Sequence, residues 1–580
     1  MRSSPFLLHF RGSARTRDGI VAPLHHATLL VIVWLAMLLR GLFYCVEQPI
    51  WEGFDEWAHF AYIQHIAECH SLPPRTELVS SQIRRSLKLV PLSRPAAEAF
   101  PGAVTHEAFW HLPAAERIRR RNELFRLSAQ YQMNDASPIA RQYEAQQPPL
   151  YYVILAPVYL LVRPLSLPSQ VLALRIVSLL IVSSIIFLGS AIALRTLRHL
   201  KPALFCIVIL AVLPGLDISI CRIGNDTLAI AITSAVVLYA LKCSGSDALL
   251  ADWLFLGTFL GAGLLTKAYV LALLPLLPIT ALIRSVTDPH VWKRTAGSCL
   301  GGSILAVSIG GWWYWNTWQK TGTISGEMFD LATSSFSVAQ KLSTAFRINW
   351  LAVADAGAFS HIWVGGWSFL LLRSWMYRVF EFLALLAGLG LFRYAARTVA
   401  IAGREGRARA LCERVILVVA YALMTLPIAY HSVLVFLIRN IPTAIGWYLY
   451  PVAVPEVVLL ILGFRGLFGP RWSTRVLLCV CILVIALDLY TVQFLLMPYY
   501  SGMIVRRASG SLDSISIAVL ARQMGALFQR ISIDKPAGIG PGAIAGMWIG
   551  YICSTAALGG VATFAASAPN CARLRRRHPG

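Results

Sequence analysis

Charged residues are scarce in this sequence. They make up 14% of the 580 residues, whereas apolar residues make up 57% and the mean hydropathy is +0.63. Soluble domains carry about 25% charged residues. The composition therefore excludes an ordinary soluble protein and predicts an integral membrane protein with many spans.

Acidic residues are fewer still. The sequence has 28 Asp and Glu but 51 Lys and Arg, which gives a formal net charge of +23. In a soluble chain this balance would suggest nucleic acid. Here the cations lie in short connectors and at both ends, where the positive-inside rule places them. We expect the lipid bilayer as a partner and no nucleic acid, because no folded basic domain is present to carry one.

Paired cysteine motifs are absent. The 11 Cys are scattered, with no CxxC spacing, which excludes a zinc site built from Cys. A cleavable signal peptide is not evident either. Residues 1–27 are predicted to be a basic cytoplasmic N-terminus, followed by a retained signal anchor that begins at Thr28.

Apolar segments recur along the whole chain and predict an all-α protein of about 12 to 13 transmembrane helices. The segment at 149–163 is short and ends in Arg163, which favours a dip into the membrane over a span. The segments lie at 28–44, 149–163, 171–194, 202–218, 227–242, 252–266, 268–284, 297–315, 376–394, 414–436, 444–464, 475–497 and 541–567.

The basic connectors between these segments are expected in the cytoplasm, which gives the domain organisation. Residues 28–497 form a transmembrane domain with a long first outer loop at 47–147 and a further outer loop at 316–375. Residues 498–580 form an outer segment, a final transmembrane helix and a basic cytoplasmic tail. In the first loop, charged and apolar residues alternate at helical spacing from Glu116 to Gln132, which predicts an amphipathic surface helix.

One stretch, Pro49 to Phe60, packs three carboxylates and an imidazole into eight residues, with aromatic residues between them. If it is helical, Asp55 and His59 share a face, as do Glu52 and Glu56. Aromatic rings favour the membrane–water interface. The stretch therefore predicts a short helix at the membrane surface whose acidic side chains point to the same place. The alternative is an ordinary solvated loop.

Further polar residues are predicted on the same outer face. Arg222, Asp226 and Lys267 stand beside apolar segments, where ionisable groups are expensive, and a Lys or Arg next to the bilayer is suited to phosphate. Helix capping by Asn225, Asp226 and Thr227 is the alternative for the acid. Snorkelling to the interface is the alternative for Lys267.

Several motifs, taken in order, resemble a bacterial family of multispanning membrane proteins of unknown function, which in turn resembles the GT-C glycosyltransferases, such as protein O-mannosyltransferases and the lipid A aminoarabinose transferase. The resemblance covers residues 28 to 500. The motifs are Pro49 with Asp55-Glu56 and His59, Tyr143 to Tyr152, Gly224 to Ala229, Leu265-Thr266-Lys267, His361 to Trp367, and Gly446 to Pro451.

This resemblance implies a GT-C-like fold and sugar transfer from a polyprenyl-phosphate donor at the outer face of the membrane. Asp55 matches the general base, and Glu56 matches the second acid of its motif. The residues expected to bind substrate or phosphate are His59, Gln147, Tyr151, Arg222, Asn225, Asp226, Lys267, Arg439 and Tyr448. There is one main departure: Trp447 stands where the family usually has Arg, so Arg439 or another cation would have to replace it.

These motifs specify no particular cofactor. A divalent metal is the one candidate, with Asp55, Glu56 and His59 as ligands; three such residues on adjacent turns of a solvated helix are the alternative.

The leading hypothesis is an inverting glycosyltransferase of the bacterial cytoplasmic membrane, with its active site facing outward. It would move a sugar from a polyprenyl-phosphate donor to a glycan, lipid or protein acceptor of the cell envelope. The alternatives are a transporter or flippase of polyprenyl-linked or other amphiphilic substrates, and a non-catalytic partner in envelope assembly. Convergence of Asp55, Asp226 and Lys267 on one outer cavity would favour the enzyme, and a central two-sided pore the transporter.

Overall fold

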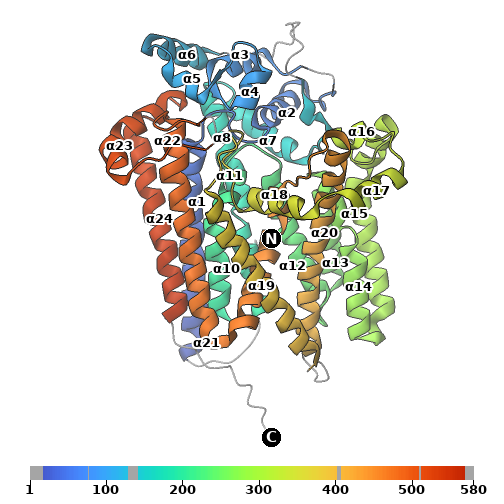
Figure 1. Ribbon diagram of the computed structural model, residues 1–580. Coiled ribbons are helices and arrows are strands. Elements are labelled where there is room, and N and C mark those ends of the chain that lie inside the picture. Colours follow the sequence, from blue (N-terminus) through green and yellow to red (C-terminus); the bar gives the residue numbers. More distant parts are fainter. Residues whose placement is uncertain (1–16, 76–77, 128–140, 401–406, 508–510, 568–580) are drawn as a thin grey trace, which may run out of the picture.

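Long apolar helices form the body of the protein and short helices cap one end of it (Figure 1). The computed structural model describes residues 17–75, 78–127, 141–400, 407–507 and 511–567. The expected basic ends at 1–16 and 568–580 lie outside these residues, as does Gln132.

Among the described residues, nine helical stretches are long and apolar enough to cross a membrane, or ten if one bent pair counts as a span. The all-α membrane fold expected from the sequence is therefore confirmed. The nine stretches are built from α1 (Arg17–Glu47), α8 (Leu167–Val182) with α9 (Ile185–Leu197), α12 (Asp226–Cys243), η2 (Ala268–Leu273) with α14 (Leu276–Thr287), α19 (Ser374–Ala400), α20 (Arg407–Arg439), η4 (Gly446–Val452) with the first half of α21 (Ala453–Tyr490), the second half of α21 with η5 (Thr491–Leu496) and α22 (Met497–Tyr500), and α24 (Pro541–Ser567).

The remaining four apolar segments are also helical, but they do not all meet the length and composition of a span. Helices of 13 and 15 residues cover only about 20 Å at 1.5 Å per residue, against about 30 Å of hydrocarbon. This explains why the expected 12 to 13 spans exceed the nine or ten that qualify. The four are α7 (Leu150–Val162), the pair α10 (Leu200–Val212) and α11 (Pro214–Ile220) bent by 55°, α13 (Leu250–Leu264) and the long but less apolar α15 (Trp292–Thr321).

Glycines allow two helix pairs to approach closely. A Cβ at Gly257 of α13 would collide with the backbone of Gly302 in α15, and one at Gly390 of α19 would collide with the backbone of Gly463 in α21. Small residues are used in this way between membrane helices, where packing replaces the hydrophobic effect. Helix α21 is divided by Gly469, whose φ of 71° and ψ of 176° break the helical path before Pro470.

The cap is formed mainly by residues 47–147. Three of its helices begin with a side-chain cap, from Ser80, Ser93 and Thr105. The surface helix expected from Glu116 is present, and its charged face carries ion pairs between Arg119 and Glu116. The elements are α2 (Glu56–Cys69), α3 (Ser81–Leu89), β1 (Pro91–Leu92), α4 (Arg94–Ala99), β2 (Val104–Thr105, parallel to β1), α5 (His106–His111), α6 (Ala114–Arg126) and η1 (Tyr143–Gln146).

Later segments complete this end of the molecule. Residues 498–540 pack directly on the cap, since Trp110 Nε1 donates to the Tyr500 carbonyl at 2.9 Å and Lys535 Nζ donates to the Gln48 carbonyl at 2.8 Å. The segment that had no assigned motif thus fastens the stretch that carries Asp55. The elements here and in the loop between α15 and α19 are α16 (Met328–Ala332), α17 (Val338–Arg347), α18 (Trp350–Ile362), α23 (Ile517–Ile531) and η6 (Ser532–Asp534). The short η3 (Pro289–Val291) instead connects α14 to α15.

A buried ionic cluster joins four helices inside the bundle. Arg40 of α1 lies 2.8 Å from Asp217 of α11 and 2.6 Å from Asp488 of α21. Tyr44 and Tyr551 of α24 donate to the same Asp488 carboxylate at 2.7 and 2.6 Å. Charges this deep persist only when they are paired and hydrogen-bonded, so the cluster ties the last helix to the first.

Candidate functional site

The stretch from Pro49 to Phe60 is not one helix. Helix α2 begins only at Glu56, and both Trp51 and Asp55 have left-handed backbones, with φ of 68° and 57°. Such angles are uncommon for residues other than glycine and persist only where surrounding contacts enforce them. The expectation that the three acids lie on one helical surface and point to one spot is therefore wrong.

Glu52 and Glu56 are held by separate structural contacts. The Glu52 carboxylate bonds His106 Nε2 at 2.8 Å and accepts from the Ser368 amide at 2.6 Å. Glu56 accepts two bonds from Arg175, at 2.6 and 2.7 Å. Both acids are fully buried.

Glu56 has further partners, since it also accepts from the amides of Trp51 and Ile223 at 3.2 and 3.1 Å. Its acceptor sites are thus occupied by groups that shape the loop. The structure does not bring Glu56 together with Asp55 as a second catalytic acid.

Asp55 is the acid that remains available. It is half-buried, and its Oδ1 accepts one hydrogen bond, from Tyr143 OH at 2.6 Å. Burial raises the pKa of Asp55, against the lowering effects of the Tyr143 bond, Arg222 and Lys267. A carboxylate with few partners and a raised pKa is suited to accept a proton.

Arg222 and Lys267 meet on Asp226. Arg222 Nη2 lies 2.9 Å from Asp226 Oδ2, and Lys267 Nζ lies 2.5 Å from Asp226 Oδ1. Tyr269 OH donates to the same Oδ1 at 3.2 Å. Arg222 comes from the turn before α12, Asp226 begins α12, and Lys267 and Tyr269 come from the break after α13 and from η2. Two cations fixed at one point are an arrangement suited to an anion such as phosphate.

Asn225 joins three of the sequence motifs. Its Nδ2 donates to the Thr266 carbonyl at 3.0 Å and to Gln147 Oε1 at 3.3 Å. It makes no side-chain cap on α12, so the capping alternative is wrong for Asn225. The contacts instead bring the motif ending at Lys267 beside the motif that contains Gln147.

Two acids that were not among the expected site residues share this region. Glu144 is buried and its Oε2 has no hydrogen-bond partner. Burial raises the pKa of Glu144, and Asp55 and Glu327 raise it further. Glu327 accepts from Gln147 Nε2 at 3.3 Å, and burial raises its pKa as well.

A sequence signal existed for one of these acids only. Glu144 belongs to the motif that ends at Tyr152, whereas Glu327 stands in an outer loop with no motif around it. We call the group Asp55, Glu144, Arg222, Asp226, Lys267 and Glu327 the basin.

The other expected residues surround the basin to different degrees. His59 Nδ1 bonds Tyr152 OH at 2.9 Å and lies 3.8 Å from Glu144; burial lowers the pKa of His59 well below its usual value. Tyr448 has its ring centre 5.4 Å from Lys267 Nζ. Tyr151 is fully buried, and its hydroxyl accepts from the Gly224 amide at 2.9 Å, which is a structural role.

Arg439 is not part of the basin. It is exposed at the end of α20 and lies over the Phe329 ring at 5.3 Å. It therefore does not stand in for the arginine that the family usually has before Tyr448.

Trp447 occupies the position at which this sequence differs from the family pattern. It stacks on Phe54 with ring centres 4.5 Å apart and planes at 13°. The Arg222 guanidinium lies 5.4 Å from the centre of the same Phe54 ring. Trp447 thus packs against the ring that neighbours a basin cation.

The expected three-residue metal site is not formed. Glu56 binds Arg175 and His59 binds Tyr152, so neither joins Asp55. Across the part of the chain that the structure describes, no group of three or more His, Cys, Asp or Glu side chains is arranged to hold a metal ion.

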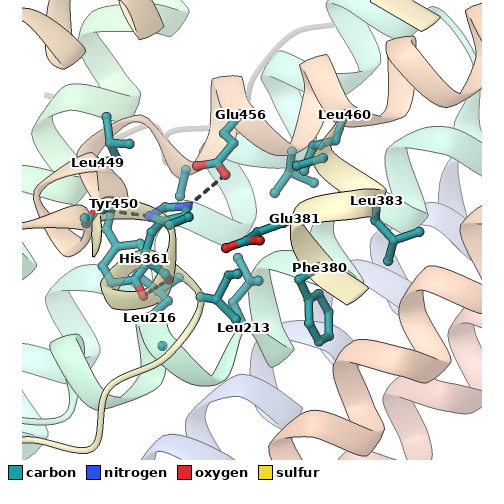
Figure 2. Close-up of a pocket in the computed structure, with 18 of the residues that line it drawn as sticks. Leu213, Leu216, His361, Phe380, Glu381, Leu383, Leu449, Tyr450, Glu456 and Leu460 are labelled. Atoms are coloured by element: carbon teal, nitrogen blue, oxygen red, sulfur yellow. Dashed lines mark hydrogen bonds and ion pairs between the residues drawn. The ribbon is translucent and has the colours of Figure 1, made fainter. Parts of the chain in front are cut away.

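An apolar cavity of about 660 Å³ adjoins the basin along η4. Tyr448 of η4 lies over Lys267 of the basin, whereas Leu449 and Tyr450 line the cavity. Its walls come from α10, α11, α18, α19, α20 and α21, and Figure 2 shows His361, Glu381 and Glu456 pointing into it.

No family model matches the chain, and no curated protein sequence matches it either. Several solved structures are similar to the chain, among them the following two. ArnT from Cupriavidus metallidurans, bound to undecaprenyl phosphate, is 13% identical with a TM-score of 0.42, and the match covers 94% of this chain and 78% of that one.

The oligosaccharyltransferase of Archaeoglobus fulgidus, tethered to an acceptor peptide, is 12% identical with a TM-score of 0.32. This match covers 92% of the present chain and 55% of the archaeal one. These are the kinds of protein that the sequence motifs resemble, and the likeness concerns the fold alone.

Proposed function

We propose that this protein is a membrane glycosyltransferase that moves a sugar from a polyprenyl-phosphate donor to an acceptor of the bacterial cell envelope. The observation that carries the proposal is the meeting of four separate motifs in the basin. Asp55 supplies a base, and Arg222 and Lys267 supply positive charge beside it. The resemblance of the same motifs to GT-C glycosyltransferases supports this reading.

In the proposed reaction an acceptor hydroxyl attacks the anomeric carbon of the donor sugar. The new bond joins the acceptor oxygen to that carbon, and the bond from the carbon to the phosphate oxygen breaks with its electron pair going to the phosphate. The hydroxyl proton passes to Asp55. A single displacement of this kind inverts the configuration at the anomeric carbon.

The departing lipid phosphate gains negative charge in this step. Lys267 and Arg222 would stabilise that charge. In the free protein both cations are held by Asp226, which keeps them in place and balances part of their charge until the phosphate arrives. The phosphate would compete with Asp226 for the same donors.

The protein is expected to act in the cytoplasmic membrane with the basin outward. Arg195 and Arg198 of one basic connector form ion pairs with Glu413 at 3.3 and 3.2 Å, and Glu413 lies in the first turns of α20, directly after the next basic connector but one. Connectors of this composition favour the cytoplasmic side, and the cap with the basin would then face outward.

The test is transfer of radiolabelled sugar from a panel of polyprenyl-phosphate sugars, with the full chain in membranes. Asp55→Asn keeps the shape of the side chain and removes the base, so transfer should fall by about 10²-fold or more. Asp513→Asn is the matched control, since Asp513 is a half-buried acid that pairs with Arg507 and is not a basin residue. Transfer that persists in Asp55→Asn would refute the assigned base, and no transfer from any donor by inserted wild-type protein would refute the function.

A further inference from the structure

The cavity beside the basin has the form of a site for an amphiphile. Its volume of about 660 Å³ lies within the range of small-molecule sites. Most of its lining is Leu, Val, Ile, Ala and Phe from helices long and apolar enough to lie in a membrane. Such walls suit a hydrocarbon chain.

Three titratable side chains interrupt the apolar lining and point into the cavity (Figure 2). His361 Nε2 lies 2.8 Å from Glu456 Oε1, and its Nδ1 lies 3.1 Å from the Gly446 carbonyl. Because that carbonyl can only accept, Nδ1 carries a proton. The imidazole is therefore fixed in orientation and holds Glu456 at the cavity wall.

Glu381 faces the same cavity, and one of its two carboxylate oxygens accepts no hydrogen bond. Its Oε2 accepts from Arg378 at 2.7 Å, whereas its Oε1 is buried and has no hydrogen-bond partner. A buried oxygen without a donor is unfavourable. The unused acceptor points to a ligand that brings a hydrogen-bond donor.

The cavity differs from the basin in its cations. Its lining, as far as the structure describes the chain, contains two glutamates and no lysine or arginine, whereas Arg222 and Lys267 belong to the basin. Glu456 is already paired with His361, and Glu381 is paired with Arg378 through Oε2 alone. At the remaining oxygen, Glu381 Oε1, a phosphate head would bring a further acceptor, whereas an ammonium head would bring N–H donors.

We propose that this cavity binds an amphiphile with an ammonium head group and an apolar chain. The ammonium has three N–H donors, so it can donate to Glu381 Oε1 and still have donors for a second acceptor of the lining, such as the Glu456 carboxylate. The chain would lie among Leu213 and Phe380, below Glu381 in Figure 2, and Leu460, which is drawn beside Glu456. This ligand is distinct from the phosphate donor, and its binding does not depend on the proposed sugar transfer.

The competing occupant is the hydrocarbon chain of the donor lipid itself. A hydrocarbon offers no donor to Glu381 Oε1 and leaves both acids facing apolar groups. The two occupants are told apart by the head group that the cavity prefers when the chain is kept constant.

The test uses three photoactivatable probes with the same twelve-carbon chain and an ammonium, a hydroxyl or a phosphate head. Each is cross-linked to the full chain in a non-ionic detergent, and labelled peptides are located by mass spectrometry. The ammonium probe should label peptides of α19 and α21, be displaced by unlabelled dodecylamine, and exceed the hydroxyl and phosphate probes.

Glu381→Gln and Glu456→Gln should each weaken binding of the ammonium probe by about tenfold or more, as expected for loss of a charge-assisted hydrogen bond. Glu123→Gln, on the surface helix α6, is the matched control and should leave labelling unchanged. Unchanged labelling in both cavity variants would overturn the proposal.

The labelling strengths of the three probes are compared on the wild-type protein, so this comparison does not depend on whether a variant folds. If the phosphate probe labels the cavity as strongly as the ammonium probe, or if no probe labels it, the proposal is wrong. Sugar transfer is not measured here, so failure of this site and failure of the proposed enzyme remain distinguishable.

Discussion

Lys267 Nζ lies 2.5 Å from Asp226 Oδ1, and this pair joins two segments that are 41 residues apart in the chain. The carboxylate also binds Arg222 on its other oxygen. One acid thus positions two cations at the same point, beside Asp55.

We expect Lys267→Met to abolish most transfer, because the phosphate would lose one of its two cations. A charge-assisted hydrogen bond contributes about 1.5–3 kcal/mol, which corresponds to a loss of about 10- to 100-fold in kcat/KM. Transfer kinetics with increasing donor would check this, and Lys267→Arg should retain part of the activity. Equal activity of Lys267→Met and wild type would show that Lys267 does not contact the donor.

The pH dependence of transfer should report on Asp55. Its pKa is raised from the ordinary value of 3.8, with burial as the largest cause, and only the ionised carboxylate accepts a proton. Activity should therefore fall as the pH decreases through this raised pKa, at a higher pH than for an unperturbed aspartate. Profiles of kcat/KM against pH measure the position of the acid limb.

Tyr143→Phe provides the companion change for that profile. It removes the 2.6 Å hydrogen bond that stabilises the Asp55 carboxylate, so the pKa of Asp55 should rise further. The acid limb should move to higher pH while the protein remains folded. A limb that stays in place would mean that another group controls it.

Glu56 should matter for stability in a way that Asp55 does not. Its pair with Arg175 is fully buried, and removing one partner of such a pair costs about 3–5 kcal/mol because the other charge is left uncompensated. Glu56→Gln and Arg175→Met should each lower the thermal unfolding temperature in detergent, and the double variant should lower it by less than the sum. Asp55→Asn should leave the unfolding temperature nearly unchanged.

Trp447 should act through Phe54. Trp447→Ala removes a stacked ring pair, which is worth about 0.5–1.5 kcal/mol beyond burial, and leaves Phe54 free to move beside Arg222. We expect a higher KM for the donor with a smaller change in kcat. Trp447→Phe keeps an aromatic ring, so its KM should lie between those of wild type and Trp447→Ala. A KM that is unchanged in Trp447→Ala would contradict this role.

The order of polar and apolar residues determined much of this protein without any structure. Hydropathy was enough to predict an all-α membrane protein, because each span must satisfy its own backbone hydrogen bonds and so leaves a long apolar run. All thirteen apolar segments lie in helices. The motifs that carry Asp55, Arg222, Asp226 and Lys267 were also visible, because ionisable groups stand out in an apolar chain.

Only the tertiary structure decided what each of those residues does. Asp55 and Glu56 are neighbours with the same chemistry, yet the left-handed backbone at Asp55 leads one toward Tyr143 and the other to Arg175. Glu327 and the cavity acids Glu381 and Glu456 come from segments without a motif. Glu327 and Glu456 depend on contacts with residues 180 and 95 positions away, and local spacing along the chain does not encode such contacts.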